Sequence, residues 1–145
     1  MRQGAEDQPT VVLTGVSSDS HTWNLVFLQL LIEEHGHRVV NLGPCVPPEL
    51  LVAECEVIDP ALVVVSTVNG HGAADGLSTI TALRAEPRLF DTPVVIGGKL
   101  GVDGAPTPTE LARLRDAGYS AVFGDGGDLS AFTSLLTSLR TRLAA

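Results

Sequence analysis

The sequence predicts an α/β fold in which one parallel β-sheet is covered by helices on both faces. Its 145 residues are enough for one domain that buries a core without disulfides or a structural metal. Short apolar runs rich in β-branched residues alternate along the chain with longer helical patterns. The short runs are apolar almost throughout, which is typical of strands buried on both faces of a parallel sheet.

Five segments are expected to form strands. They are residues 11–16, 38–42, 61–66, 93–97 and 121–123. Because β–α repeats are joined by right-handed crossovers, few arrangements of these strands are possible. For five strands we expect a flavodoxin-like (Rossmann-like), doubly wound sheet with the order 2-1-3-4-5.

Five helices are expected between and after these strands. They cover residues 22–35, 47–57, 74–86, 108–117 and 128–143. Proline at the first turn of the second and fourth of them suits a helix start. Gly36 and Gly118 stand where a helix C-terminal cap is expected, and Trp23 is expected to pack against the rest of the fold.

The chain is expected to form a single domain over residues 1–145, with residues 1–9 as a loose tail. Its formal net charge of −8 argues against nucleic acid or an anionic membrane as partner. The N-terminal segment lacks the apolar core of a secretory signal, and no apolar run reaches the roughly 20 residues that span a bilayer. Two cysteines ten residues apart indicate neither a disulfide framework nor a zinc site, so we expect a cytoplasmic protein.

The expected fold also predicts the position of the site. Ligands of open α/β sheets bind beyond the carboxyl ends of the strands, where the strand order reverses. Here that point lies between the first and third strands, whose loops are residues 17–24 and 67–72. The pair Gly97-Gly98 ends the fourth strand beside them.

Asp19 and His21 form a D-x-H pattern in the first of these loops. A carboxylate at this spacing can bind one ring nitrogen of the histidine and leave the other as a metal ligand of raised basicity. The alternative is a solvated loop histidine beside an aspartate that caps the following helix, and the pattern alone leaves it open.

The spacing of further residues extends this pattern. Asp19-x-His21-x-x-Asn24 is followed by 41 residues, Ser66-x-Val68, 28 residues and the pair Gly97-Gly98. This resembles D-x-H-x-x-G, S-x-L and G-G at matching distances in the cobalamin-binding domains of mutases and of methionine synthase. The segments GVSSDSHTWN, VVNLGPCVPPEL and VVVSTVNGHG look like the small subunit of glutamate mutase (methylaspartate mutase). The resemblance covers residue 11 to about residue 130.

The resemblance implies that His21 is the lower axial ligand of cobalt, replacing the cofactor's own base, and that Asp19 binds His21; these two are the implied catalytic pair. The displaced nucleotide tail would lie in a slot between the first helix and the sheet. Ser66 would bind the tail, and Gly97-Gly98 would leave room for it. The full set of expected cofactor-binding residues is Ser17, Ser18, Asp19, Ser20, His21, Thr22, Asn24, Ser66, Val68, Gly70, Gly97, Gly98, Lys99, Gly124 and Gly126.

The family resemblance also implies an activity. The chain would bind adenosylcobalamin and belong to an isomerase that interconverts glutamate and 3-methylaspartate by a radical 1,2-rearrangement. A large TIM-barrel subunit would complete a heterotetramer and bind most of the amino-acid substrate. Alternatives are the small subunit of an acyl-CoA mutase, a corrinoid methyl carrier, and a non-enzymatic flavodoxin-like module that binds a flavin nucleotide.

Two residues depart from the family pattern. Val68 replaces a leucine, and Asn24 replaces the glycine of D-x-H-x-x-G. Asparagine tolerates a positive φ better than other non-glycine residues, so the backbone could be kept. Its amide could also crowd the tail, and a homologue that no longer binds cobalamin is therefore a further alternative.

Overall fold

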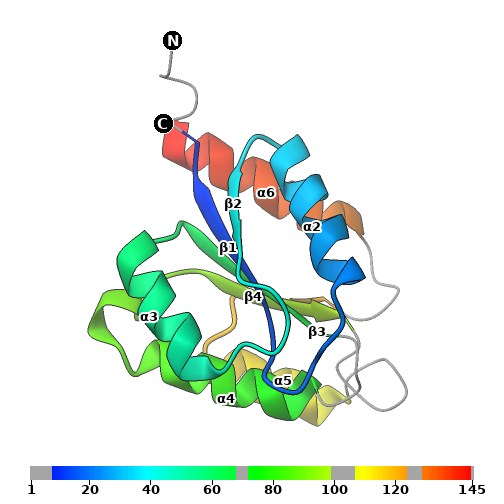
Figure 1. The fold of residues 1–145 in the computed structure, drawn as a ribbon, viewed down its shortest axis with the longest axis vertical. Coiled ribbons are helices and arrows are strands. Elements are labelled where there is room, and N and C mark those ends of the chain that lie inside the picture. The colour runs from blue at the N-terminus through cyan, green and yellow to red at the C-terminus, as the bar shows by residue number, and fades with distance from the viewer. Residues whose placement is uncertain (1–7, 68–71, 99–106, 124–128, 145) are drawn as a thin grey trace.

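The computed structural model describes residues 8–67, 72–98, 107–123 and 129–144. They contain a five-stranded parallel sheet with the order β2-β1-β3-β4-β5 (Figure 1). Its strands are β1 (Thr10–Gly15), β2 (Arg38–Asn41), β3 (Leu62–Thr67), β4 (Val94–Gly98) and β5 (Ala121–Phe123). The predicted fold class and strand order are confirmed.

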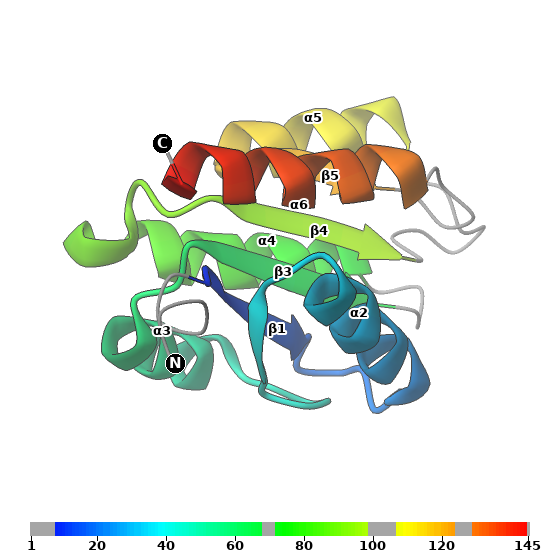
Figure 2. The same ribbon diagram turned by 90° about the horizontal axis from the view of Figure 1, so that it is seen from above.

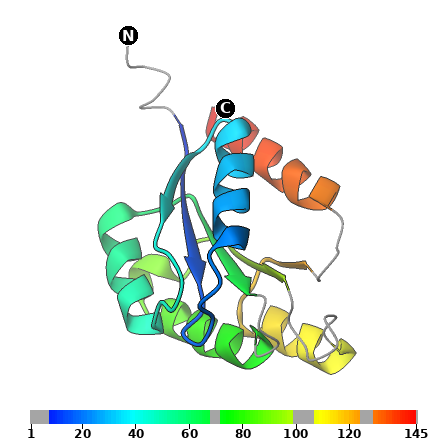
Figure 3. The ribbon, with the colours of Figure 1, turned by 45° about the vertical axis from the view of Figure 1, so that its right-hand side comes forward.

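The helices form one layer on each face of the sheet. They are α2 (Trp23–Glu34), α3 (Pro48–Ile58), α4 (Gly72–Arg84), α5 (Pro108–Ala117) and α6 (Leu129–Ala144). Figures 1 and 3 show α2 and α6 on one face and α3, α4 and α5 on the other. A 3-10 helix, η1 (Pro87–Leu89), precedes β4 and was not predicted. None of the described helices has the length and apolar character needed to cross a membrane.

The core consists of two clusters separated by the sheet. Successive residues of a strand point to opposite faces, so Val12 and Val63 pack with α3, α4 and α5, whereas Val11 and Val64 pack with α2 and α6. Apolar side chains on both faces therefore explain the uninterrupted apolar runs of the sequence.

Arg84, at the end of α4, joins several segments at the side of the sheet where the strands begin. The carbonyls of Leu89 (2.8 Å), Phe90 (2.9 Å) and Thr92 (2.8 Å) share the two N–H groups of its Nη1, and Nη2 donates to the Gly118 carbonyl (2.7 Å). Burial lowers the pKa of this guanidinium, but arginine stays charged in proteins and keeps all its donors. One side chain thus holds the turn before β4 against the end of α5.

Two local expectations differ from the structure. Trp23 is 83% exposed rather than packed, because it lies on the face of α2 that turns away from the core. Pro9 is buried, and its carbonyl accepts a hydrogen bond from the Arg38 backbone (2.8 Å), so the folded domain begins inside the expected tail.

Candidate functional site

The carboxyl ends of β1, β3 and β4 lie at one edge of the sheet, next to the start of α2 (Figure 2). The register of the strands aligns Gly15 with Ser66, and Ser66 with Gly97. These positions, distant in the sequence, therefore form a row across three adjacent strands. The strand residues predicted to line the site therefore lie side by side at this edge.

Asp19 and His21 form a hydrogen-bonded pair in the loop between β1 and α2. Asp19 Oδ1 lies 2.7 Å from His21 Nδ1 and accepts the His21 backbone N–H at 3.0 Å. A carboxylate only accepts, so Nδ1 donates in this pair, and the neutral imidazole then has its lone pair on Nε2. Asp19 is buried, whereas the His21 side chain is 59% exposed. A buried carboxylate thus orients an accessible imidazole, which is the arrangement of a metal-ligating histidine.

Further bonds fix the loop that carries this pair. The Asp19 carbonyl accepts the backbone N–H of Cys45 (2.9 Å), and the Asp19 N–H donates to the Val16 carbonyl (3.1 Å). Ser18 donates to the carboxylate of Asp75 in the first turn of α4. The histidine therefore stands on a loop that is tied to both flanking segments.

Asn24 and Ser66 meet across the space between α2 and β3. Asn24 Nδ2 donates to Ser66 Oγ at 2.7 Å, although 42 positions separate the two residues. Ser66 is buried in β3, and Asn24 Oδ1 is buried without a hydrogen-bond partner among the residues described. The structure thus brings together two predicted tail-binding residues through a direct bond that the sequence did not predict.

The glycines Gly97 and Gly98 have local steric reasons for lacking a side chain. A Cβ on Gly97 would lie 3.2 Å from Phe123 Cβ in β5. Gly98 has a φ of +106°, and a Cβ there would lie 1.9 Å from the Thr67 carbonyl oxygen. The neighbouring strands therefore require a glycine at position 98 and favour one at position 97, in addition to any room that they leave for a ligand.

The remaining expected site residues fall into two groups. Ser17, Ser20 and Thr22 are exposed at the same loop, and Ser17 Oγ lies 3.5 Å from the Val46 carbonyl that it bonds. The others lie outside the described residues: Val68, Gly70, Lys99, Gly124 and Gly126.

The segment after β2 also borders the site, which was not predicted from the sequence. A pocket of about 480 Å³ lies beside the site loop, between the start of α2 and this segment. Its lining residues are Thr22, Leu25, Val26, Gln29, Asn41, Gly43 and Pro44. Because β2 is parallel to β1, its carboxyl end also lies at the site edge. The expected parallel sheet could therefore have identified this segment from the sequence. Asp75 was also not predicted, although α4 begins at the same edge and so places its first turn beside the site loop.

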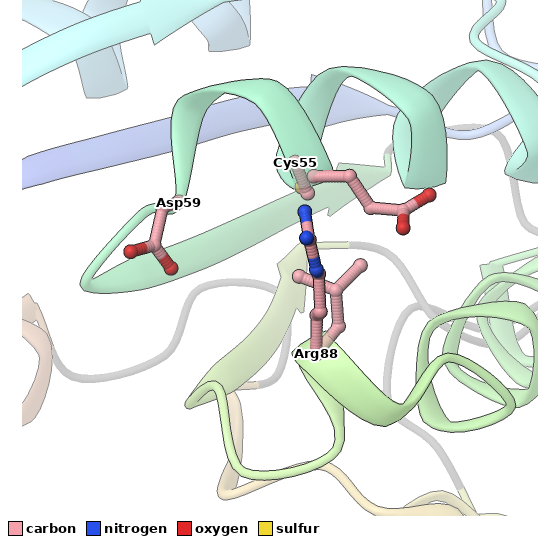
Figure 4. A pocket seen from close by; sticks show the side chains of 5 residues that line it. Cys55, Asp59 and Arg88 are labelled. Atoms are coloured by element: carbon pink, nitrogen blue, oxygen red, sulfur yellow. The ribbon is translucent and has the colours of Figure 1, made fainter.

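A second pocket, of about 320 Å³, lies at the opposite edge, where α3 ends and η1 precedes β4 (Figure 4). Cys55, Asp59 and Arg88 are among its lining residues. Burial, followed by the charge of Glu54, raises the pKa of the Cys55 thiol to about 12, so it is a poor metal ligand at neutral pH.

Within the described ranges, no three His, Cys, Asp or Glu residues are grouped to hold a metal ion. A single oriented histidine instead fits a metal that arrives inside a cofactor.

Known proteins of similar sequence include glutamate mutase subunits. The chain is 28% identical to the glutamate mutase sigma subunit of Halobacterium salinarum over 135 residues, covering 93% of this chain and 87% of that protein. It is also 28% identical to that of Escherichia coli O157:H7, covering 88% and 85%. The predicted resemblance to glutamate mutase small subunits is confirmed.

Solved structures share the fold. A cobalamin-binding protein from Desulfitobacterium hafniense matches with a TM-score of 0.70 and 24% identity, covering 89% of this chain; this chain spans only 59% of that one. A chemotaxis protein from Vibrio cholerae matches with a TM-score of 0.69 and 10% identity, covering 91% and 98%. Corrinoid-binding proteins and signal receivers thus share this sheet, and structural likeness alone does not separate them.

A protein-family model distinguishes between corrinoid-binding proteins and signal receivers for this chain. The model described as "B12 binding domain" matches residues 9–132, from the start of β1 into α6. The match includes Asp19, His21, Asn24 and Ser66, which meet at the carboxyl edge of the sheet. The chain therefore belongs to the B12-binding domain family.

Proposed function

We propose that the chain is the cobalamin-binding small subunit of glutamate mutase, and that it holds adenosylcobalamin through His21. The observation that carries the proposal is the Asp19–His21 pair, 2.7 Å apart, with Nε2 left available at the ligand edge of the sheet. This chain covers most of the length of its glutamate mutase relatives, which supports glutamate mutase as the enzyme.

The residues of this chain would bind and orient the cofactor. Asp19 would hold the proton on Nδ1, so that Nε2 of His21 could bind cobalt with increased basicity. Asn24 and Ser66 bond each other across the space between α2 and β3, and their polar groups would contact the nucleotide tail there. When bound, adenosylcobalamin supplies the organic radical that starts the interconversion of glutamate and 3-methylaspartate.

A second subunit is part of this proposal. Ser20, His21 and Thr22 are exposed, so the described residues leave the histidine at an open surface. Radical chemistry requires a site closed to water and to side reactions. A large catalytic subunit, proposed to be a TIM barrel, would cover this edge and bind most of the amino-acid substrate.

The outer face of α2 supports a docking position for that subunit. Trp23, Val26, Phe27 and Leu30 follow helical spacing and are all exposed, Trp23 by 83% and Leu30 by 62%. This apolar face begins two residues after His21, on a helix that lies at the outside of the fold (Figure 3). A subunit that covers His21 would therefore also reach the first turns of α2.

Replacing Phe27 by serine is expected to weaken assembly with a glutamate mutase large subunit by about tenfold or more, because exposed aromatic side chains dominate interface energies. Val57→Ser on α3 is the matched control, since Val57 is as exposed as Trp23 and lies on the other face of the sheet. Dissociation constants from sedimentation or surface binding would measure both. Equal effects of the two changes would contradict this docking position.

The function itself is tested by electron paramagnetic resonance of cob(II)alamin bound to the full chain, together with a glutamate mutase large subunit. With uniformly ¹⁵N-labelled chain, each cobalt line is expected to split into doublets, whereas unlabelled chain gives triplets. This change identifies a nitrogen of the protein as the axial ligand. Triplets in both samples would contradict the proposed function, because the base of the cofactor would still be bound to cobalt.

A further inference from the structure

The side chain of Asn24 leaves one hydrogen-bonding position unused. It projects from the first turn of α2 and donates Nδ2 to Ser66 Oγ (2.7 Å), while Oδ1 is buried without a partner among the described residues. Exchanging the two ends of the amide would let its oxygen accept from the serine hydroxyl, but the amide nitrogen would then be unsatisfied. In either orientation, one polar atom lacks a partner in this position.

An unsatisfied buried polar atom is costly, so a water molecule or a ligand is expected to complete the pairing, and a ligand in this slot can be matched to it. A primary amide offers an acceptor beside a donor, and this combination pairs in two places with adenine, which presents an amino donor beside a ring-nitrogen acceptor. Dimethylbenzimidazole has one free ring nitrogen when it leaves cobalt, and its other edge carries methyl groups. It has no donor for Asn24 Oδ1.

We propose that Asn24 is a specificity-determining residue that selects the base of the nucleotide tail, favouring adenine over dimethylbenzimidazole. The inference rests on the proposed function, because only a cofactor bound with its tail between α2 and β3 brings a base to Asn24. A glycine at this position would offer no side-chain pairing and would accept either base. Asn24 thus converts a permissive slot into one that distinguishes bases by hydrogen bonding.

The test compares the dissociation constants of two cob(II)amides, one with dimethylbenzimidazole and one with adenine as base, measured by anaerobic calorimetry with the full chain. Selectivity is the ratio of the two constants. The bases also differ in their own affinity for cobalt, but this difference is the same for every variant and cancels when selectivities are compared. From wild type to Asn24→Gly, selectivity for adenine is expected to fall about tenfold, the loss of one well-made hydrogen bond.

Asn24→Ala is the second variant, because alanine removes the amide without the helix destabilisation of glycine. It is expected to lose the same selectivity. Cobinamide, which lacks the nucleotide, is the matched ligand control, and all three chains are expected to bind it equally.

Each remaining outcome overturns a defined statement. Unchanged selectivity in both variants, with protein nitrogen still bound to cobalt, would overturn the inference and leave the proposed function standing. Tight binding of both cobamides by the variants alone would make Asn24 a plug rather than a selector, and would also overturn it. If no chain gives protein-nitrogen coupling with either cobamide, the proposed function itself fails.

Discussion

Replacing His21 by alanine is expected to abolish the protein-nitrogen coupling to cobalt while leaving the fold intact. The imidazole is 59% exposed, and Asp19 keeps the backbone N–H of residue 21 as a hydrogen-bond donor after the change. The change removes one hydrogen bond from the buried Asp19 carboxylate, so the free energy of unfolding is expected to fall by about 1–2 kcal/mol without loss of the fold. The ¹⁵N doublets should therefore disappear, while the circular dichroism spectrum stays that of the wild type and the urea midpoint falls only modestly.

Two further variants show whether the effect is specific. Asp19→Asn is expected to keep the nitrogen ligand but to weaken cobalamin binding by about 10- to 100-fold, because an outer carboxylate raises the basicity of the imidazole. His35→Ala removes a histidine at the end of α2 whose Nδ1 bonds the Leu31 carbonyl (2.9 Å), and ligation should be unaffected. Doublets that persist in His21→Ala would refute the axial-ligand role.

Replacing Arg84 by alanine is expected to lower the free energy of unfolding by about 2–4 kcal/mol. Four backbone carbonyls lose a charged donor, and each such bond contributes up to a few kcal/mol when it is shielded from water. Arg84 is only partly buried, so water replaces some of the lost bonds and the expected total is below their sum. The turn before β4 and the end of α5 should separate first.

Urea unfolding at constant slope would measure this loss. Arg113→Ala on α5 is the matched control, because Arg113 is exposed, and it should change stability by no more than about 0.5 kcal/mol. Arg84→Lys should fall between the two, since an ammonium group cannot reach four carbonyls in the plane of a guanidinium. An Arg84→Ala protein as stable as Arg113→Ala would show that the four bonds are replaced by water.

Most of the fold could be predicted because it depends on patterns local to each element. The strands are mostly apolar runs, handedness rules leave few orders for them, and 2-1-3-4-5 is a common one among these. Element ends differ by one or two residues, as for α4, which begins at Gly72 rather than at residue 74. The three-residue helix η1 is too short to leave a periodic signal.

The candidate site was predictable only in part. The spacing of Asp19, His21, Ser66 and the glycine pair identified it, because parallel strands bring their carboxyl ends together. The Asn24–Ser66 bond could not be predicted, since it depends on how α2 is rotated against the sheet. The bonds of Arg84 were equally inaccessible, because backbone carbonyls carry no mark in the sequence.

The close approach of β4 to its neighbours affects how such sequences should be compared. Any side chain at Gly98 would overlap the Thr67 carbonyl, so folding alone preserves this glycine, whereas a side chain at Gly97 would press on Phe123 and could be accommodated by a small shift. A descendant of this chain that had abandoned cobalamin would still carry Gly98. In such a descendant, Gly98 would show only common ancestry, whereas the histidine of the first loop and the residue at position 24 would show whether cobalamin is still bound.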